Sequence, residues 1–353
     1  MILQPRYSIT NSTLSNIAKA AAAKEIIENA PLVPALEVKF RQEALVKTVH
    51  HSTHLEGNPL DLASAKEILD GRDIEADIHN IQEIINLRNV LKFIEQKITS
   101  SDTKITIGDL LTIHHLTVYR ILPAKFAGEF RTAPAVVKDK AGRLIYTAPK
   151  PHEVPNLVEA FLTWLNSPTA VKIHPLIRAA VAHYEIVRIH PFSDGNGRTA
   201  RAVSTLVLFL SGFDVKEFFS LDEYFDLDPG RYYAALKKVS DKPQLAGKSA
   251  NLTPWIEYFT QAVAVELNKV KERVLKLSRD ARLKRKLGQL ALSERQARLM
   301  EYIQDYGKIA SGEWRRLFPE YSDDTILRDL KELISKKVVR KKGKTKAAVY
   351  LLA

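Results

Sequence analysis

Cysteine is absent from this 353-residue chain, which removes several kinds of chemistry at once. Disulfide bonds, zinc sites built from thiolates, iron–sulfur clusters and cysteine nucleophiles all require that side chain. A chain without cysteine suits a reducing compartment, so we expect a cytoplasmic protein.

Long apolar runs are also missing. The longest apolar stretch lies near residues 202–210 and is too short to span a bilayer. The first ten residues, MILQPRYSIT, lack the basic segment and apolar core of a signal peptide. We therefore expect a soluble protein with no membrane partner.

What remains is the composition of an ordinary globular protein, with 45% hydrophobic and 27% charged residues, 14 glycines and 16 prolines. This composition excludes disordered, collagenous and fibrous proteins. The length predicts two domains, or one large domain with an appendage.

The net charge of +12 is concentrated at the C-terminal end. Residues 271–353 hold 22 basic and 11 acidic side chains, whereas residues 1–270 hold 31 and 30. A near-neutral body with a basic end indicates a module that meets an acidic partner, of which nucleic acid is the usual example. The alternative is that these charges form a solvated helix surface.

Helices are predicted over most of the first 277 residues, because apolar residues recur there at three- and four-residue spacing between Gly, Pro, Asp and Ser. The exception is 135–147, where an apolar–turn–apolar pattern predicts an exposed β-hairpin flap. The expected fold class is therefore mainly α with a hairpin. The predicted helices cover 17–29, 36–56, 61–69, 73–96, 107–119, 153–166, 174–189, 197–210, 229–239 and 254–277.

The last 64 residues predict a winged helix-turn-helix domain. Three helices are expected over 293–306, 311–318 and 322–336, the last capped by Ser322, and a basic hairpin follows over 338–352.

DNA is one candidate partner of this domain, because Arg328, Lys331 and the basic hairpin could contact phosphates. Asp323 and Asp324 stand at the leading end of the recognition helix and would repel a DNA backbone. Packing, homodimer formation and recruitment of a partner stay open as alternatives.

One polar loop between two apolar helices holds most of the candidate chemistry, residues 190–201, with the sequence HPFSDGNGRTAR. Gly195 and Gly197 remove side chains where backbone amides can meet an anion, and the next helix directs its positive N-terminal end at the same point. Arg198 and Arg201 lie on one face of that helix and can grip phosphate groups. The pattern predicts a phosphate cradle.

The same loop offers a metal ligand and a base. Asp194 supplies a carboxylate of the kind that holds Mg²⁺ together with phosphates. His190 supplies an imidazole that is neutral near pH 7 and can take a proton from a hydroxyl. The alternative is that these residues only cap a helix, but a cap needs one or two of them rather than the whole set.

Three histidines, His50, His51 and His54, stand close together before Glu56. Their four-residue spacing is compatible with zinc, but the central glutamate of the usual helical zinc motif is absent. Packed or solvent-facing histidines are the preferred interpretation.

These residues carry a resemblance to the Fic family. Residues 190–201 match the family signature, His-x-Phe-x-(Asp/Glu)-Gly-Asn-Gly-Arg-x-x-Arg, throughout. Residues 128–131, Gly-Glu-Phe-Arg, precede the predicted hairpin, which looks like the family's flap for docking a target protein. His174 and Pro175 open the preceding helix. The resemblance covers about residues 36–260.

The resemblance implies an activity and a role for each loop residue. Most Fic proteins transfer AMP from ATP to a Tyr, Thr or Ser hydroxyl of a target protein and release pyrophosphate. By position, His190 is then the general base, Asp194 holds Mg²⁺ and Phe192 is a core anchor. Some members transfer UMP, phosphate or phosphocholine instead. The implied nucleotide-binding residues are Gly195, Asn196, Gly197, Arg198 and Arg201.

A second motif resembles the family's inhibitory pattern, (Ser/Thr)-x-x-x-Glu-(Gly/Asn), with Ser52, Glu56 and Gly57 at its fixed positions. Glu56 is expected in a last helical turn, where the helix dipole disfavours a carboxylate, so a cation partner would explain its placement. The resemblance indicates Arg201, whose capture would deny the γ-phosphate its partner. The alternatives are a solvated glutamate, or one that assists removal of AMP as in some relatives.

Together these observations predict an N-terminal helical region over 1–110 with the inhibitory motif, a Fic catalytic core over 111–277, a basic linker over 278–289 and the winged helix over 290–353. The leading hypothesis is an autoinhibited protein adenylyltransferase. The alternative from another class is a DNA-binding regulator that uses its nucleotide pocket as a sensor.

Overall fold

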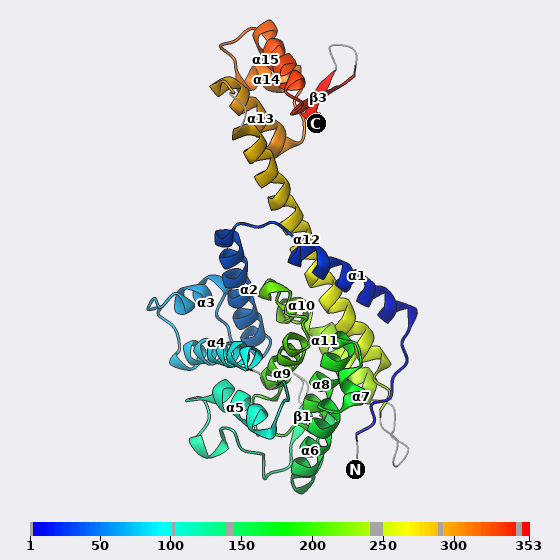
Figure 1. Cartoon of the computed structure of the whole chain (residues 1–353). Helices are drawn as coiled ribbons and strands as arrows, with labels where there is room; N and C mark the ends of the chain where they lie inside the picture. Colours follow the sequence, from blue (N-terminus) through cyan, green and yellow to red (C-terminus); the bar gives the residue numbers. More distant parts are fainter. Residues whose placement is uncertain (1–2, 101–102, 139–143, 241–249, 289–291, 344–347) are drawn as a thin grey trace. The chain divides into compact units, whose positions relative to one another are not determined.

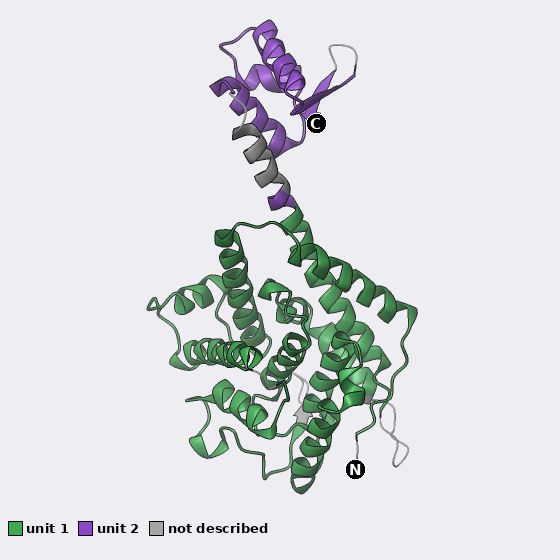
Figure 2. Ribbon diagram, in the orientation of Figure 1, with its two compact units in different colours: residues 1–275 green, residues 276–353 purple. Residues whose placement is uncertain are grey.

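The computed structural model describes residues 3–100, 103–138, 144–240, 250–288, 292–343 and 348–353. The chain divides into two compact units, Met1–Leu275 and Lys276–Ala353, which Figure 2 distinguishes by colour. Within the described residues, no helix combines the length and apolar character that a membrane span requires.

The first unit is built almost entirely from helices, which confirms the predicted mainly α fold class (Figure 1). Its α-helices are α1 (Asn11–Glu28), α2 (Pro34–His54), α3 (Leu62–Leu69), α4 (Ile78–Thr99), α5 (Ile107–Val118), α6 (Val154–Leu165), α7 (Pro168–Val171), α8 (Pro175–Ile189), α9 (Asn196–Leu210), α10 (Leu221–Leu227), α11 (Pro229–Ser240) and the first part of α12 (Thr253–Gly288), a helix that continues past Leu275 into the second unit. Short 3₁₀ helices are η1 (Ala124–Phe126), η2 (Pro151–Glu153) and η3 (Val215–Glu217).

Local capping chemistry explains most of the helix starts. Asp61 accepts a hydrogen bond from the backbone N–H of Ser64 at the start of α3, and Thr106 and Asp109 form a reciprocal capping box at the start of α5. His174 caps α8, whose first residue is Pro175, as predicted. These side chains satisfy N–H groups that a helix cannot satisfy itself.

Two sequence predictions are corrected here. The helix predicted over 36–56 ends at His54, so Glu56 follows the helix instead of standing in its last turn. The helix predicted over 73–96 begins at Ile78, because Asp77 caps it there. The short helix α10 was not predicted from the sequence, and it proves to carry residues that contact α2.

Helices α8 and α9 form the centre of the first unit. Nearly every side chain of α8 is buried, and the Trp255 indole of α12 donates to the carbonyl of Ala180 at 2.7 Å. A helix buried on all sides has little freedom to shift, because the protein interior is close-packed. The loop between α8 and α9 is therefore held at both ends by the core.

The predicted hairpin is confirmed, with β1 (Val136–Lys138) and β2 (Leu144–Thr147) pairing antiparallel. The Tyr146 hydroxyl donates to the carbonyl of Arg188 at 2.8 Å and so anchors the hairpin to α8. Its turn, residues 139–143, lies outside the described residues.

The second unit contains α13 (Glu294–Tyr306), α14 (Ser311–Leu317) and α15 (Asp323–Ser335), followed by the antiparallel strands β3 (Val339–Lys342) and β4 (Val349–Leu352). This is the order of elements predicted from the sequence, and Ser322 caps α15 as expected. A core that includes Leu299, Trp314 and Leu330 joins the elements. Residues 344–347 of the hairpin turn lie outside the described part. The basic linker was predicted over 278–289; α12 continues through this segment to Gly288, and nothing is described of its side chains from residue 279 onward.

Candidate active site

The 190–201 loop connects α8 to α9 through two residues whose backbone conformation is left-handed. His190 ends α8 with φ of 50°, and Gly195 precedes α9 with φ of 73°. A Cβ on Gly195 would come within 2.8 Å of Val118 Cγ1. Both the backbone conformation and the missing side chain are thus required for α9 to begin where it does.

Inside the loop, the side chain of Asn196 forms two hydrogen bonds with the backbone of Phe192. The Asn196 amide donates to the carbonyl of Phe192 at 2.9 Å and accepts from its N–H at 3.0 Å. Phe192 is completely buried, as predicted for a core anchor, and its ring stacks on His114 with centroids 3.7 Å apart. The side chain of Asn196 is therefore occupied within the loop, which leaves its backbone N–H for an anion.

His114 of α5 fixes the loop from a second helix. Its Nδ1 accepts from the N–H of Gly128 at 3.0 Å, so its Nε2 carries the proton and donates to the carbonyl of Asp194 at 3.1 Å. Burial lowers the pKa of His114 to about 4, so the ring stays neutral and keeps this tautomer. Sequence reasoning did not single out His114.

The His190 imidazole is chemically suited to accept a proton. Burial lowers the pKa of His190 below its ordinary value, and the nearby charge of Arg131 adds to this effect. Its Nδ1 is buried without a hydrogen-bond partner among the described residues. A neutral imidazole at pH 7 can act as a general base.

Arg131, the last residue of the Gly-Glu-Phe-Arg segment, joins this base to the hairpin. Its Nε donates to the carbonyl of His190 at 2.7 Å. Its Nη1 and Nη2 donate to the carbonyls of Ala133 and Pro149, at 3.1 and 2.6 Å, on either side of the hairpin. Arg131 thus ties the two ends of the hairpin to the loop.

The start of α9 presents an anion-binding surface. The backbone N–H groups of Asn196, Gly197 and Arg198 stand in the first turn, where they have no acceptor within the helix. They lie at the positive end of the helix dipole. Converging N–H groups at a helix start suit a phosphate.

Asp194 meets the requirements of a magnesium ligand. Its side chain is 58% exposed, and Oδ1 accepts from the N–H of Gly195 at 2.6 Å, which orients the carboxylate. A single accessible carboxylate beside a phosphate-binding surface is the donor set that Mg²⁺ prefers, since the ion takes its other ligands from phosphates and water.

The two arginines of the loop have different surroundings. Arg198 is buried, and its Nη1 donates to Glu83 Oε1 of α4 at 2.5 Å, while its Nη2 lies 3.7 Å from Asp194 Oδ2. Glu83 was not predicted from the sequence. Its carboxylate neutralises and positions Arg198 beside Asp194.

Arg201 lies at the centre of a network that includes the second motif. Its Nη2 donates to Glu56 Oε1 at 2.9 Å and to the carbonyl of Ser52 at 2.8 Å, and its Nε donates to Ser52 Oγ at 2.9 Å. Its Nε also lies 2.9 Å from Asp222 Oδ1 of α10. Burial alone would lower the pKa of Arg201, but the nearby carboxylates raise it, so the guanidinium stays charged.

The carboxylate of Glu56 occupies the space that Gly197 leaves free. A Cβ on Gly197 would come within 2.2 Å of Glu56 Oε1 and 3.2 Å of Arg201 Nη1. Arg201 Nη1 is itself buried without a hydrogen-bond partner among the described residues. A buried N–H donor without an acceptor is uncommon in a folded protein and requires an explanation.

The structure thus brings His190, Asp194 and the α9 start together in one loop and adds Glu56 through Arg201. Gly57 follows Glu56 with φ of 104°, a conformation that favours glycine. Sequence reasoning missed Glu83, His114 and Asp222, because their pairing with the loop is visible only in the fold.

Comparison with known proteins points to one family. Residues 104–208 match the Fic/DOC family, which confirms the resemblance for that part of the chain. The protein adenylyltransferase Fic of Aedes aegypti is 36% identical over 181 residues, covering 50% of this chain and 34% of that protein. The protein of the same description from Nematostella vectensis is 33% identical over 178 residues, covering 49% and 39%. The matched region is thus little more than a third of the length of these relatives.

Solved structures show the same fold. A Fic family protein from Desulfovibrio desulfuricans G20 has a TM-score of 0.65 and 22% identity, covering 99% of this chain and 98% of that one. Residues 134–508 of Fic-1 from C. elegans give a TM-score of 0.61 with 25% identity, covering 76% and 73%.

Proposed function

Because residues 104–208 of this chain form a domain of the Fic/DOC family, we propose that it is a protein adenylyltransferase. It would transfer AMP from ATP to a Tyr, Thr or Ser hydroxyl of a target protein and release pyrophosphate. The observation that carries this proposal is the 190–201 loop, where a neutral imidazole, an accessible carboxylate and the start of α9 are fixed together by Asn196 and His114.

In this reaction His190 takes the proton of the attacking hydroxyl as the oxygen bonds to the α-phosphorus of ATP. The bond from that phosphorus to the bridging oxygen breaks, and pyrophosphate leaves with the bonding electrons. The N–H groups at the start of α9 stabilise the charge that develops on the phosphates. Magnesium, when bound at Asp194, neutralises part of the same charge. Arg198 and Arg201 would hold the β- and γ-phosphates.

The hairpin β1–β2 is proposed as the docking site for the target. An extended peptide can add as a strand to an exposed hairpin through backbone hydrogen bonds. Arg131 supports this role, because it connects both ends of the hairpin to the carbonyl of His190. A target docked there would present its hydroxyl on the same side of the molecule as the base.

We also propose that Glu56 keeps the enzyme inhibited. Its carboxylate fills the space over Gly197 and holds Arg201, so a triphosphate could not place its γ-phosphate on that arginine. A misplaced triphosphate would leave the α-phosphorus out of line with the attacking oxygen. The contact with Ser52, one turn earlier on α2, supports this arrangement.

The position of the label in ATP tests the proposed reaction. The chain is incubated with Mg²⁺ and ATP labelled at either the α- or the γ-phosphorus, and protein-bound label is measured, its own hydroxyls serving as acceptors. We expect label from the α-position only, since AMP is transferred. Label from the γ-position would identify a kinase and overturn the proposal. Labelled UTP in place of ATP tests whether the chain transfers another nucleotide. Loss of AMP from the labelled protein over time tests whether the chain also removes AMP.

DNA binding by the second unit is a second candidate function, favoured by one observation. Arg328, Lys331 and Arg340 are exposed. Of the two acids that would repel DNA, Asp323 is paired with Arg315, whereas Asp324 is exposed. Hydrogen bonds from Arg315 and Trp314 lower the pKa of Asp323 to about 2. Its charge is therefore shared with a guanidinium.

Homodimer formation and the cytoplasmic compartment stay predictions.

Salt dependence tests this second function. If the full chain binds duplex DNA through Arg328 and Lys331, affinity should fall steeply with salt, and the slope of log K against log salt should become shallower by about 1 for each of these residues changed to Ala. Fluorescence anisotropy measures both. Binding that is insensitive to salt, or equal in the double variant, would exclude the DNA-binding interpretation.

A further inference from the structure

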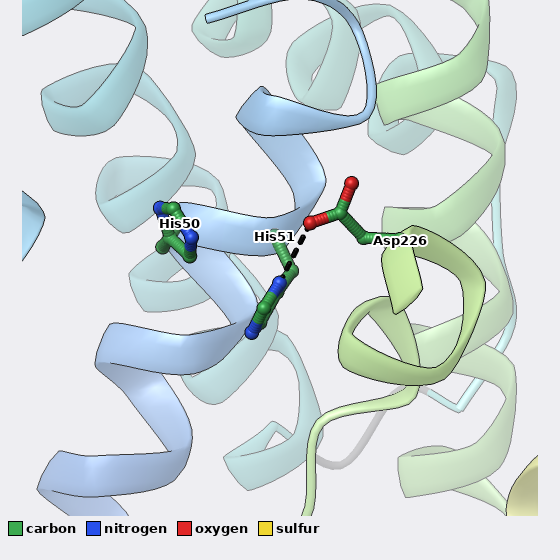
Figure 3. Close-up of side chains that lie close together, drawn as sticks. All are labelled: His50, His51 and Asp226. Carbon is green, nitrogen blue, oxygen red and sulfur yellow. Dashed lines mark hydrogen bonds and ion pairs between the residues drawn. The ribbon is translucent and has the colours of Figure 1, made fainter. Parts of the chain in front are cut away.

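The histidines before Glu56 meet an acidic residue from another helix (Figure 3). His51 Nδ1 of α2 lies 2.7 Å from Asp226 Oδ2 of α10. His54 Nδ1 lies 2.8 and 2.9 Å from the two oxygens of the same carboxylate. One ligand atom from each of His50, His51 and Asp226 falls within 4.8 Å of the others. The fold thus places a carboxylate beside histidines that the sequence shows without one.

One ring nitrogen of His50 is not engaged by any other residue that the structure describes. The residue is 9% exposed, and its Nδ1 is buried with no hydrogen-bond partner among the described residues. Burial, with smaller contributions from the charges of His51 and His54, lowers the pKa of His50. A buried nitrogen without a partner is a feature that requires an explanation.

We infer that His50, His51, His54 and Asp226 bind a divalent transition-metal ion, with Zn²⁺ the best match. Imidazole nitrogens and one carboxylate are ligands that zinc accepts in tetrahedral sites. Bonds of about 2.0–2.2 Å place the donor atoms of such a site roughly 3.4 Å apart. The separations among the ligand atoms of His50, His51 and Asp226, between 2.7 and 4.8 Å, bracket that value. His54 Nδ1 joins this group through Asp226, at 2.8 and 2.9 Å from its two oxygens.

The surroundings of the cluster allow an ion to enter. The side chain of His54 is 51% exposed, whereas that of Asp226 is 5% exposed. The site is thus open at His54 and closed at the carboxylate. Three imidazole nitrogens and one carboxylate around Zn²⁺ would give the site a net charge of about +1.

Such an ion would cross-link the inhibitory helix to α10. Helix α2 ends at His54, and Glu56 follows within two residues. Helix α10 carries both Asp226 and Asp222, the partner of Arg201. Zinc would therefore hold α2 against α10 with Glu56 in place. This regulatory consequence, unlike the metal site itself, rests on the proposed inhibition by Glu56.

Zinc stoichiometry tests the site directly. The full chain is stripped with a chelator, dialysed against micromolar Zn²⁺ and analysed by elemental mass spectrometry. We expect one zinc per chain in the wild type and in the controls Asp228→Asn and His152→Ala. We expect a loss of at least tenfold in affinity for Asp226→Asn and His54→Ala. Binding that is absent in the wild type, or unchanged in both cluster variants, would overturn the inference.

Thermal unfolding separates a metal site from a misfolded variant. Zinc should raise the melting temperature of the wild type and of Asp228→Asn, because it binds the folded chain, and should leave that of Asp226→Asn unchanged. His54→Ala removes an exposed side chain and is the safer variant for folding. An equal rise in Asp226→Asn would mean that zinc binds elsewhere.

Transfer assays test the regulatory consequence. Zinc should lower AMP transfer by the wild type and leave that by Glu56→Gly unchanged. If zinc inhibits the wild type and Glu56→Gly equally, the proposed effect of the cross-link on Glu56 is overturned, but the metal site itself is not. If neither protein transfers AMP, the proposed function fails, and zinc stoichiometry still decides the metal site.

Discussion

Replacing Glu56 with glycine should raise AMP transfer on the order of 100-fold, the scale on which a misplaced reacting group slows a reaction. The change empties the space over Gly197 and frees Arg201 for a γ-phosphate. The initial rate of label incorporation from α-labelled ATP, with the chain as its own target, measures the effect.

Two further variants show whether the contact with Arg201 is responsible. Glu75→Gly removes an exposed carboxylate from the loop before α4 and should leave the rate unchanged. Glu56→Gln keeps the size of the side chain but weakens the charged hydrogen bond, so it should give an intermediate rate. If Glu56→Gly still binds ATP but transfers AMP no faster than the wild type, the proposed inhibition by Glu56 is refuted.

Replacing His190 with alanine in the Glu56→Gly background should lower transfer by about 100-fold or more, the usual contribution of a general base. The Glu56→Gly background is needed because a further loss of AMP transfer is hard to measure in an enzyme that is already inhibited. Nucleotide binding should survive, since the anion-binding N–H groups belong to α9. His152→Ala, a change of an exposed histidine, is the matched control.

The pH profile gives a second signature of His190. Burial lowers the pKa of His190, so the neutral base predominates at pH 7 and transfer should fall only when the pH drops below the ordinary histidine value of about 6.5. The charge of Glu56 raises this pKa, so Glu56→Gly should move the acid limb to still lower pH. If transfer is retained in His190→Ala, or if the acid limb lies above pH 7, another group must be the base.

Local signals explain how much of the site could be predicted from the sequence. The glycines, arginines and acid of the 190–201 loop are contiguous, and their chemistry follows from a helix start that lacks acceptors for its N–H groups. The hairpin and the Ser322 cap are equally local. A pattern that is complete within a dozen residues can be interpreted without the fold.

The missing parts of the site are those that depend on contacts distant in sequence. Glu83 meets Arg198 across 115 residues, and His114 meets Asp194 across 80. Asp222 lies on α10, whose seven residues are too few for a clear helical period. Asp226, on the same helix, converts a row of histidines into a candidate metal site. No property of these acids in the sequence distinguishes them from solvated ones.

Asp222 bears on the inhibition that we propose for Glu56, because it is a second carboxylate beside Arg201. A buried guanidinium stripped of its counterion is destabilised by several kcal/mol. Asp222 Oδ1, 2.9 Å from Arg201 Nε, remains as a fixed counterion when Glu56 departs. If Glu56 inhibits as we propose, its departure therefore leaves Arg201 paired with one buried carboxylate, so release does not carry the further cost of an unpaired buried charge.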